Sequence, residues 1–283
     1  MRFICPLILL FSICLAACST VSLQTPALAT DMVTSTSPVA ASIPQAAPAV
    51  ETRIAQPTAS AIPEPEEAVL ILEPGPGSRV ASPIHIEGMA DSTFEQNLVV
   101  EILNADGTQL AVSPVTIQAE LGQRGPFAID IPVQASSEQP LFVQVSASSP
   151  RDGGITHLAS VVVSIVENGQ VDIKRMEPRA EQIQILSPAV GQTLKGGVAV
   201  VEGYGWASFE QTLVVELYDE QGTLLTMQPI IVQSPEMGQP GLFRAELAYT
   251  INIPGAGRIV VRDPSVAFAG DVHVTSVEVR LEP

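Results

Sequence analysis

Three cysteines are the side chains in this sequence best suited to covalent chemistry, because a thiolate is both a nucleophile and a metal ligand. They are Cys5, Cys14 and Cys18. Cys18 directly follows Ala16 and Ala17, at the end of an apolar run over residues 3–15. Small residues at that point suit a peptidase site, and the sulfur supplies a nucleophile. We therefore expect a signal segment that is cleaved before Cys18.

The N-terminal segment as a whole resembles that of an exported bacterial lipoprotein. Met1-Arg2 is a short positive start, the apolar run is too short to span a bilayer comfortably, and Leu15-Ala16-Ala17-Cys18 resembles a lipobox. The resemblance implies a signal peptide over 1–17 and a diacylglyceryl group on the sulfur of Cys18, which would anchor the chain on the extracytoplasmic face of the cell membrane. In an organism with an outer membrane, that membrane is the alternative location. Simple secretion is the other interpretation.

Charge and cysteine content exclude several classes of function for the mature chain. Without Arg2 it has 12 basic residues against 30 acidic ones, a net charge of −18. Such a surface repels nucleic acid, so no nucleic-acid partner is expected. With Cys5 and Cys14 removed and Cys18 acylated, neither a disulfide nor a cysteine-based metal site can form. The folded parts must be held together by core burial.

The histidines and two repeated glutamates are the remaining candidates for chemistry. His85 has no counterpart in the second half of the chain, which favours an edge or rim histidine over a metal ligand. His157 and His273 occupy matching places with inward parity, and we expect a structural hydrogen bond there. Glu95 and Glu210 each follow a phenylalanine that we expect to be buried. We expect their carboxylates to accept main-chain hydrogen bonds at a turn rather than to act as general acids, because a glycosidase needs two convergent carboxylates in a cleft. We expect no catalytic residue, no metal and no cofactor, and therefore not an enzyme.

Residues 18–67 have the composition of a tether. The stretch after Cys18 is rich in Ala, Pro, Thr and Ser, with seven prolines and no aromatic residue. Such a segment cannot bury enough apolar surface to offset its ordering entropy, and its prolines favour extended conformations. The sequence predicts a disordered, semi-stiff spacer that holds a folded part away from the membrane.

Beyond the tether the chain repeats itself. The clearest match is between Phe94-Glu95-Gln96 and Phe209-Glu210-Gln211, whose phenylalanines are 115 residues apart. Matching Glu-Gly pairs precede this motif, and Phe127 and Phe243 follow it in the two halves. A duplicated domain explains the pattern. We place the first unit at 68–167, a linker at 168–179 and the second unit at 180–283, and we expect the basic Lys174, Arg175 and Arg179 to be a solvated linker rather than a binding patch.

Each unit has the pattern of a small all-β domain. Short apolar stretches alternate with polar residues and are punctuated by turn signals, without a sustained helical period. Phe94, Leu98, Val100 and Ile102 share one parity and predict the buried face of a strand. About seven strands in about 100 residues indicate an immunoglobulin-like β-sandwich without the antibody disulfide. A small barrel is the structural alternative.

Both units also resemble the immunoglobulin-like domain associated with bacterial spore germination. The motifs that carry the resemblance in the first unit are Pro74, Gly88-Met89-Ala90, Phe94-Glu95 and Gly107. Their counterparts in the second are Pro188, Gly203-Tyr204-Gly205, Phe209-Glu210 and Gly222. The family is an accessory domain attached to other envelope modules. The resemblance therefore implies a fold and a location more than a mechanism, and a role in germination does not follow.

The two units differ most where Gly203 leads to Phe209. This stretch holds Tyr204 and Trp206, and Trp206 is the only tryptophan of the chain. We expect a loop at one end of the second sandwich, in which both side chains contact a partner, because Trp and Tyr are enriched at binding hot spots. The alternative is that Trp206 folds back as a lid over the core.

Two hypotheses of function follow. In the first, the chain is a non-catalytic envelope lipoprotein whose tandem domains bind an unidentified envelope protein or glycan. In the second, it is a structural spacer or assembly subunit of an envelope complex without a ligand of its own. An exposed aromatic patch favours the first, and uniformly polar loops favour the second.

Overall fold

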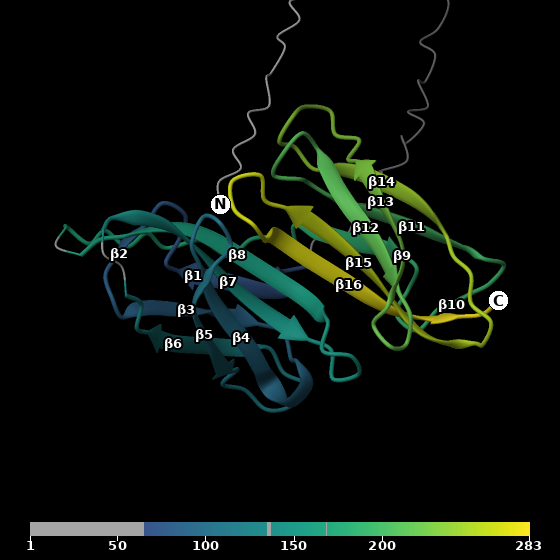
Figure 1. Cartoon of the computed structure of the whole chain (residues 1–283), viewed down its shortest axis with the longest axis horizontal. Helices are drawn as coiled ribbons and strands as arrows, with labels where there is room; N and C mark the ends of the chain where they lie inside the picture. The colour runs from purple at the N-terminus through teal and green to yellow at the C-terminus, as the bar shows by residue number, and fades with distance from the viewer. Residues whose placement is uncertain (1–64, 135–136, 168) are drawn as a thin grey trace, which may run out of the picture. The chain divides into compact units, whose positions relative to one another are not determined.

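The computed structural model describes residues 65–134, 137–167 and 169–283, all within one compact unit that runs from Ser60 to Pro283. Apart from one short 3-10 turn, its regular elements are β-strands (Figure 1). Two β-sandwiches follow each other along the chain, as predicted. The predicted all-β, immunoglobulin-like fold is confirmed.

The first sandwich packs two sheets face to face. One sheet has the strand order β1-β3-β6, and the other contains β8-β7-β4-β5, with β2 running parallel beside β8. The elements are β1 (Val69–Glu73), β2 (Arg79–Val80), β3 (Ile84–Ala90), η1 (Phe94–Gln96), β4 (Asn97–Leu103), β5 (Gln109–Thr116), β6 (Gly125–Ile131), β7 (Gln139–Ser148) and β8 (Ile155–Ile165).

The second sandwich repeats this arrangement. Its smaller sheet has the order β14-β11-β9, and its larger one contains β13-β12-β15-β16, with β10 running parallel beside β16. The elements are β9 (Ile183–Ser187), β10 (Thr193–Leu194), β11 (Val198–Gly205), β12 (Thr212–Tyr218), β13 (Leu224–Ile231), β14 (Gly241–Ala248), β15 (Gly255–Pro264) and β16 (Asp271–Leu281).

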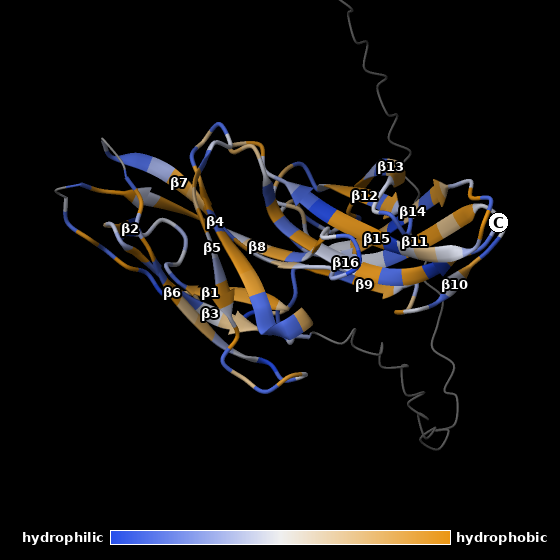
Figure 2. Cartoon of the chain, turned by 60° about the horizontal axis from the view of Figure 1, so that its bottom comes forward, coloured by the Kyte–Doolittle hydropathy of each residue, from blue (hydrophilic) through white to orange (hydrophobic). Residues whose placement is uncertain are grey.

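Each sandwich has its own hydrophobic core, built by strands with alternating apolar and polar side chains (Figure 2). Leu98, Val100 and Ile102 are buried in the first core as predicted, and Leu213, Val215 and Leu217 fill the corresponding places in the second. Because the two sheets of each unit remain separate layers joined through these cores, the barrel alternative is excluded.

A glycine facing a phenylalanine explains two of the repeated motifs. Gly88 on β3 pairs with Phe127 on β6, and Gly203 on β11 pairs with Phe243 on β14. A Cβ added at Gly203 would lie 2.0 Å from the ring of Phe243 and 2.5 Å from the carbonyl oxygen of Gln184. In both units, atoms of the phenylalanine ring lie where a Cβ would be, so only glycine fits at these two positions.

The larger sheets of the two sandwiches join into one continuous sheet. The connection is a short antiparallel pairing between β16 and β8, in which His273 lies opposite Ala159 and Val274 opposite Leu158. Beside it the rings of Phe142 and Phe268 stack with centroids 4.9 Å apart. The two domains therefore share backbone and side-chain contacts along this junction.

The predicted burial of Phe94 and Phe209 is wrong. Phe94 is 59% exposed and Phe209 is 45% exposed. Phe94 lies in η1, before β4 begins, so it does not follow the alternation of that strand. The buried side chain of this turn is instead that of Gln96, which is only 3% exposed.

The segment between the sandwiches is bonded to the first sandwich. Arg79 and Asp172 exchange two main-chain hydrogen bonds of 2.8 and 2.9 Å, and the Met176 N–H donates to the carbonyl of Leu72 at 2.8 Å. The Arg175 side chain forms ion pairs with Glu73 and Glu87. Lys174 and Arg175 are exposed and Arg179 is partly exposed, in agreement with the predicted solvated segment, while main-chain pairing and ion pairs hold its backbone to the first sandwich.

Pro65 to Glu67, the last residues of the predicted tether, also belong to the folded unit. The Glu181 N–H donates to the carbonyl of Pro65 at 2.8 Å, and the Glu67 N–H donates to that of Arg179 at 3.2 Å. The rest of the predicted tether lies outside the described residues. None of the helices in the described part of the chain has the length and apolar composition of a membrane span.

Candidate functional site

The repeated Phe-Glu-Gln motif forms the same unusual turn in both domains. Glu95 and Gln96 have φ angles of 54° and 56°, and Glu210 and Gln211 have φ angles of 47° and 57°. Positive φ is sterically costly for residues with a Cβ and persists where surrounding contacts enforce it. Each turn reverses the chain before a core strand and leaves its phenylalanine facing solvent.

A buried glutamine side chain enforces the turn in the first domain. The Nε2 of Gln96 donates to the carbonyls of Glu120 at 2.9 Å and Gln123 at 3.0 Å, and the Thr93 N–H donates to its Oε1 at 3.3 Å. In the second domain the Nε2 of Gln211 contacts the hydroxyl of Ser234. The glutamine thus ties the turn to the loop that precedes the next strand of the smaller sheet.

Aromatic and apolar residues are close in sequence, or opposite in strand register, where β11 of the second domain ends. Tyr204 is on β11 directly opposite Leu242 of β14, which is 53% exposed. Trp206 follows two residues later on the same side of the extended chain, and Phe209 comes three residues after it. We call Tyr204, Trp206, Phe209 and Leu242 the aromatic end. The first domain has Met89, Asp91, Phe94 and Pro126 in the corresponding places.

The predicted loop over 203–209 is only partly correct. Gly203, Tyr204 and Gly205 belong to β11, because this strand continues its pairing with both neighbours to residue 205. The loop begins at Trp206, whose N–H donates to the carbonyl of Gln182 at 3.2 Å. Tyr204 and Trp206 are both half-buried, which lies between the two predicted alternatives of full exposure and a core lid.

His85 and the other two histidines differ in their surroundings. His85 lies on the solvent face of β3, where its Nδ1 is 2.8 Å from Oδ1 of Asp130. The hydrogen bond to Asp130 raises the pKa of His85 despite desolvation. His157 on β8 is partly buried, and burial lowers its pKa. No metal-ligand cluster of three His, Cys, Asp or Glu side chains occurs within the described ranges.

His273 makes the structural hydrogen bond that the sequence predicts, but with a charged partner. Its Nε2 is 2.5 Å from Oε1 of Glu181, and its Nδ1 is 3.3 Å from Oε1 of Glu67. Glu67 also receives two hydrogen bonds from Arg179, at 2.5 and 2.8 Å. The residues come from three segments distant in sequence, and they meet between the two sandwiches.

A second polar contact joins the domains on the outer face of the continuous sheet. Asp152, in the turn after β7, accepts a hydrogen bond of 2.7 Å from Nη1 of the buried Arg258 on β15. Burial by itself raises the pKa of Asp152, but the hydrogen bonds from Arg258 and Gly154 lower it to about 2. Nearby, burial and its hydrogen bond to Glu216 raise the pKa of Tyr218 to about 12. These groups line a cavity of 310 Å³ and are already paired with one another.

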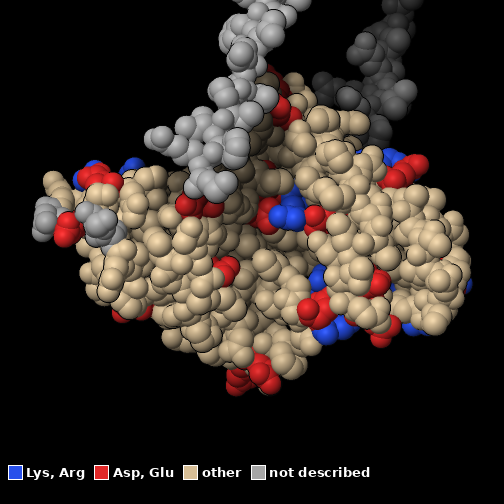
Figure 3. Space-filling model, in the orientation of Figure 1, with Lys and Arg blue, Asp and Glu red and all other residues tan. Residues whose placement is uncertain are grey.

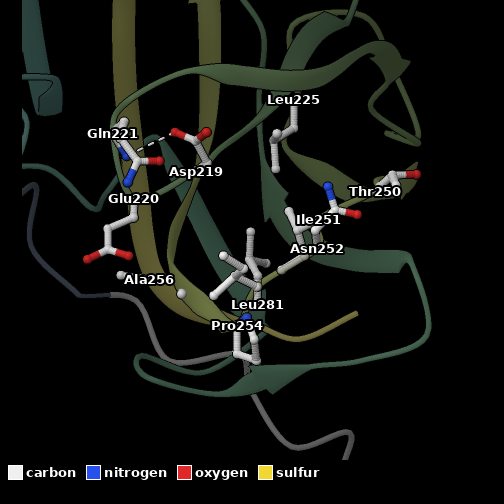
Figure 4. A pocket seen from close by; sticks show the side chains of 12 residues that line it. Asp219, Glu220, Gln221, Leu225, Thr250, Ile251, Asn252, Pro254, Ala256 and Leu281 are labelled. Atoms are coloured by element: carbon white, nitrogen blue, oxygen red, sulfur yellow. Dashed lines mark hydrogen bonds between the residues drawn. The ribbon is translucent and has the colours of Figure 1, made fainter.

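The cavities are open clefts rather than enclosed sites. One of 370 Å³ lies at the far end of the second domain, where Leu225, Ile251 and Leu281 form an apolar floor (Figure 4). Asp219 at its edge accepts a hydrogen bond from the main chain of Gln221 at 2.9 Å, which fixes the turn between β12 and β13. Another cleft, of 420 Å³, lies between the domains and has Phe94 in its wall.

Basic side chains are not gathered into a patch on the face seen in Figure 3, where Lys and Arg lie beside Asp and Glu. Cys18, the predicted site of lipid attachment, lies outside the described residues.

Comparison with known proteins identifies the first sandwich. The sequence model of the immunoglobulin-like domain of bacterial spore germination matches residues 68–154. The first sandwich is similar to this family over those residues. The match covers β1 to β7 and includes the turn at Phe94-Glu95-Gln96, which the second sandwich repeats.

Solved structures with some similarity to the chain come from varied proteins. Dimeric latent PorU from Porphyromonas gingivalis is 14% identical with a TM-score of 0.26, over 78% of this chain and 20% of that one. The Ig1-2 module of the Drosophila receptor protein tyrosine phosphatase DLAR is 10% identical with a TM-score of 0.21, over 77% of this chain and 100% of that one. Bovine butyrophilin is 12% identical with a TM-score of 0.22, over 75% and 98%. The chain thus spans about a fifth of the length of PorU. No curated protein matches it in sequence.

Sequence reasoning missed the roles of Gln96, Gln211 and Glu67. The glutamines belong to the repeated motif, so the duplication itself was a signal that they matter. Glu67 stands at the end of a polar, proline-rich stretch and has no counterpart that would single it out. Only its position in the fold reveals that it is fully buried.

Proposed function

We propose that the chain is a non-catalytic lipoprotein of the cell envelope, which presents its immunoglobulin-like domains to an envelope protein or glycan. The lipid on Cys18 would hold it to the membrane, and the proline-rich tether would set its reach. The aromatic end of the second domain would contact the partner. An immunoglobulin-like domain is a scaffold that serves as a binding or structural module, so the site rather than the fold must carry this proposal.

The observation that carries the proposal is the composition of the aromatic end. Three aromatic residues fall within six positions, and Leu242 adds an exposed apolar side chain opposite Tyr204. Aromatic residues give a large, stiff contact area at small entropic cost, and they dominate binding hot spots. The turn at Gln211 holds Phe209 in an exposed position at the cost of two residues with positive φ. Such strain favours a functional role for the side chain it presents.

Mutual pairing of the buried charged groups supports the non-catalytic part of the proposal. His273 lies between two carboxylates, and Asp152 is bonded to Arg258. Asp263 accepts hydrogen bonds from Ser208 and Gln182. A general acid or base must be free to reach a substrate in a cleft. These groups instead hold parts of the fold together.

A spacer or assembly subunit is the second candidate. The continuous sheet across the two sandwiches favours it, because paired strands join the domains into one unit that could set a fixed distance in a complex. The two candidates differ in whether the aromatic end touches another molecule.

Site-specific photo-crosslinking in intact cells distinguishes the two. A photoreactive amino acid is placed at Trp206 or Phe209, with Phe94 as the matched control, because Phe94 occupies the same turn in the first domain and is also exposed. A binding role at the aromatic end predicts a discrete adduct from positions 206 and 209 and none from position 94. Phe209→Ala should then weaken the adduct formed at position 206.

An absence of adducts from positions 206 and 209, in a chain that still reaches the membrane, would contradict the binding role. The spacer role predicts that assembly of the envelope complex survives Phe209→Ala but changes when the tether is shortened.

A further inference from the structure

Two short segments meet the second domain at the junction between the sandwiches. Glu66 forms an antiparallel β-bridge with Ala180, and Ala68, the residue before β1, donates its N–H to Oε2 of Glu181 at 2.7 Å. The segment entering the first domain and the segment leaving it are thus paired with each other. Both lie against His273 of β16 through the side chains of Glu67 and Glu181.

Four charged groups at this point are paired and largely withdrawn from water. The side chain of Glu67 is 0% exposed, that of His273 is 3% exposed and that of Glu181 is 8% exposed. Arg179 supplies the second cation through its two hydrogen bonds to Glu67. Two carboxylates and two cations balance only when His273 is protonated. A neutral imidazole would direct a lone pair at one of the carboxylates.

The surroundings of His273 favour its charged form. Burial by itself lowers the pKa of His273, but the hydrogen bonds and charges of Glu181 and Glu67 raise it to about 9. Burial raises the pKa of Glu181, but the hydrogen bond and charge of His273, together with the Ala68 N–H, lower it overall. His157 of β8 and Asp263 of β15 are the other titratable groups nearby. Burial lowers the pKa of His157 and raises that of Asp263, so both tend toward their neutral forms.

We propose that Glu67, Arg179, Glu181 and His273 form an interdomain latch, in which the protonated imidazole of His273 holds the first domain's entry and exit segments against the second domain. Removing one partner of a buried charge pair leaves the other uncompensated, which is strongly destabilising. While the latch is closed, the two sandwiches unfold together. When His273 loses its proton, the coupling weakens and each sandwich unfolds separately.

The pH window of the latch follows from the two shifted groups. The pKa of His273 is raised in the folded chain. The contribution of His273 to the coupling is therefore complete below its ordinary pKa of 6.5 and is lost as the pH rises through about 9. The folded pKa of Glu181 is lowered, so its contribution is present above 4.5 and is lost as the pH falls through the lowered value. The coupling is therefore strongest at about pH 5–6.5 and fails in alkaline solution.

Thermal unfolding of the full mature chain, followed by two signals, tests the latch. Fluorescence of the single tryptophan, Trp206, reports the second domain, and far-ultraviolet circular dichroism reports both. At pH 6 the two transitions should coincide. At pH 10 they should separate by about 4–8 °C or more, as expected when coupling worth about 1 kcal/mol is lost from a domain of this size.

Two variants and two controls make the test specific. Glu67→Gln and His273→Gln should separate the transitions already at pH 6, and His273→Gln should remove the further change between pH 6 and 10. Glu67 lies outside both hydrophobic cores, so its variant keeps the test valid if His273→Gln fails to fold. Arg151→Gln, which breaks the more exposed interdomain ion pair with Glu278, and His85→Gln should behave like wild type. Coincident transitions in Glu67→Gln at pH 6, or a pH response that persists in His273→Gln, would overturn the proposal.

Discussion

At the scale of single residues, the phenylalanine and the glutamine of the repeated Phe-Glu-Gln motif have different roles. The phenylalanine faces solvent, and the glutamine is bonded to the neighbouring loop; Gln96 is buried and Gln211 is partly buried. A buried amide that satisfies main-chain carbonyls is costly to remove, because the carbonyls then lack partners away from water. The structural role of the motif therefore belongs to Gln96 and Gln211, and the phenylalanines are free to serve contact with another molecule.

Gln96→Ala should destabilise the first domain by about 1–3 kcal/mol, because it leaves buried carbonyls of the loop at Glu120 and Gln123 without donors. Phe94→Ala, two residues earlier, should reduce the free energy of unfolding by about 0.5 kcal/mol or less, because that side chain is largely exposed. Urea denaturation followed by circular dichroism measures both. A larger loss for Phe94→Ala than for Gln96→Ala would mean that the ring packs in solution after all.

The role of Gln96 could not be predicted from alternation of polar and apolar residues. Parity assigns side chains to faces only while the backbone stays extended, and φ angles of 54° and 56° at Glu95 and Gln96 interrupt it. The sequence pattern from Leu98 onward was reliable because β4 is regular from Asn97. A polar residue that repeats in a duplicated motif is the signal that points to such a turn.

At the scale of elements, the glycine–phenylalanine pairs connect the strands of the smaller sheets. Gly203→Ala should destabilise the second domain by about 1–3 kcal/mol or more, since the new methyl group would overlap the Phe243 ring and a main-chain carbonyl. The urea midpoint of Trp206 fluorescence measures the effect. The double variant Gly203→Ala, Phe243→Leu should recover part of the stability lost in Gly203→Ala. If the effects of the two substitutions on stability are strictly additive, overlap with the ring is not the cause of the loss.

The edge strands carry a second repeated device. Pro114 lies in β5 and Pro229 in β13, the two outermost strands of the continuous sheet. Proline cannot donate a main-chain hydrogen bond, so it hinders the addition of a further strand from another molecule. Pro229→Val should therefore increase self-association, because Met227 and Ile231 of the same strand are exposed. Sedimentation at increasing protein concentration tests this, and a variant that stays as monomeric as the parent chain would contradict it.

Strand positions and the existence of two cores were predictable because both depend on local patterns and on duplication. The pairing of β16 with β8 was not, since only two residue pairs make it and each strand also has a full partner within its own sandwich. Nothing in the local pattern of either strand distinguishes a free edge from one that joins another domain.

At the scale of the whole molecule, the anchor and the folded part should be separable. Cys18→Ala should abolish incorporation of labelled lipid and release the chain from membranes, since the thiol is the proposed attachment point. Its thermal unfolding should match that of the mature chain with or without reductant, because no cysteine follows Cys18. Fractionation of cells and metabolic labelling check the first outcome. Membrane retention of the variant without lipid label would contradict the anchor.

The charged groups of the interdomain junction could not be predicted from the sequence. Arg179 ends the predicted linker, Glu181 lies at the start of the predicted second unit, and Glu67 lies at the end of the predicted tether. Each belongs to a polar stretch in which a solvated side chain is the ordinary expectation. Their burial depends on three segments meeting in space, and composition carries no information about that meeting.

The position of Glu67 also determines which contacts would bear a pulling force applied through the proposed membrane anchor. A pull transmitted along the tether reaches Pro65 and Glu66 first, and these residues are bonded to the segment at Ala180 and Glu181. The ion pairs of Glu67 with Arg179 and His273 must rupture before the pull extends into β1 at Val69. These ion pairs would therefore break first under a pulling force, and both hydrophobic cores would stay folded while the junction opens.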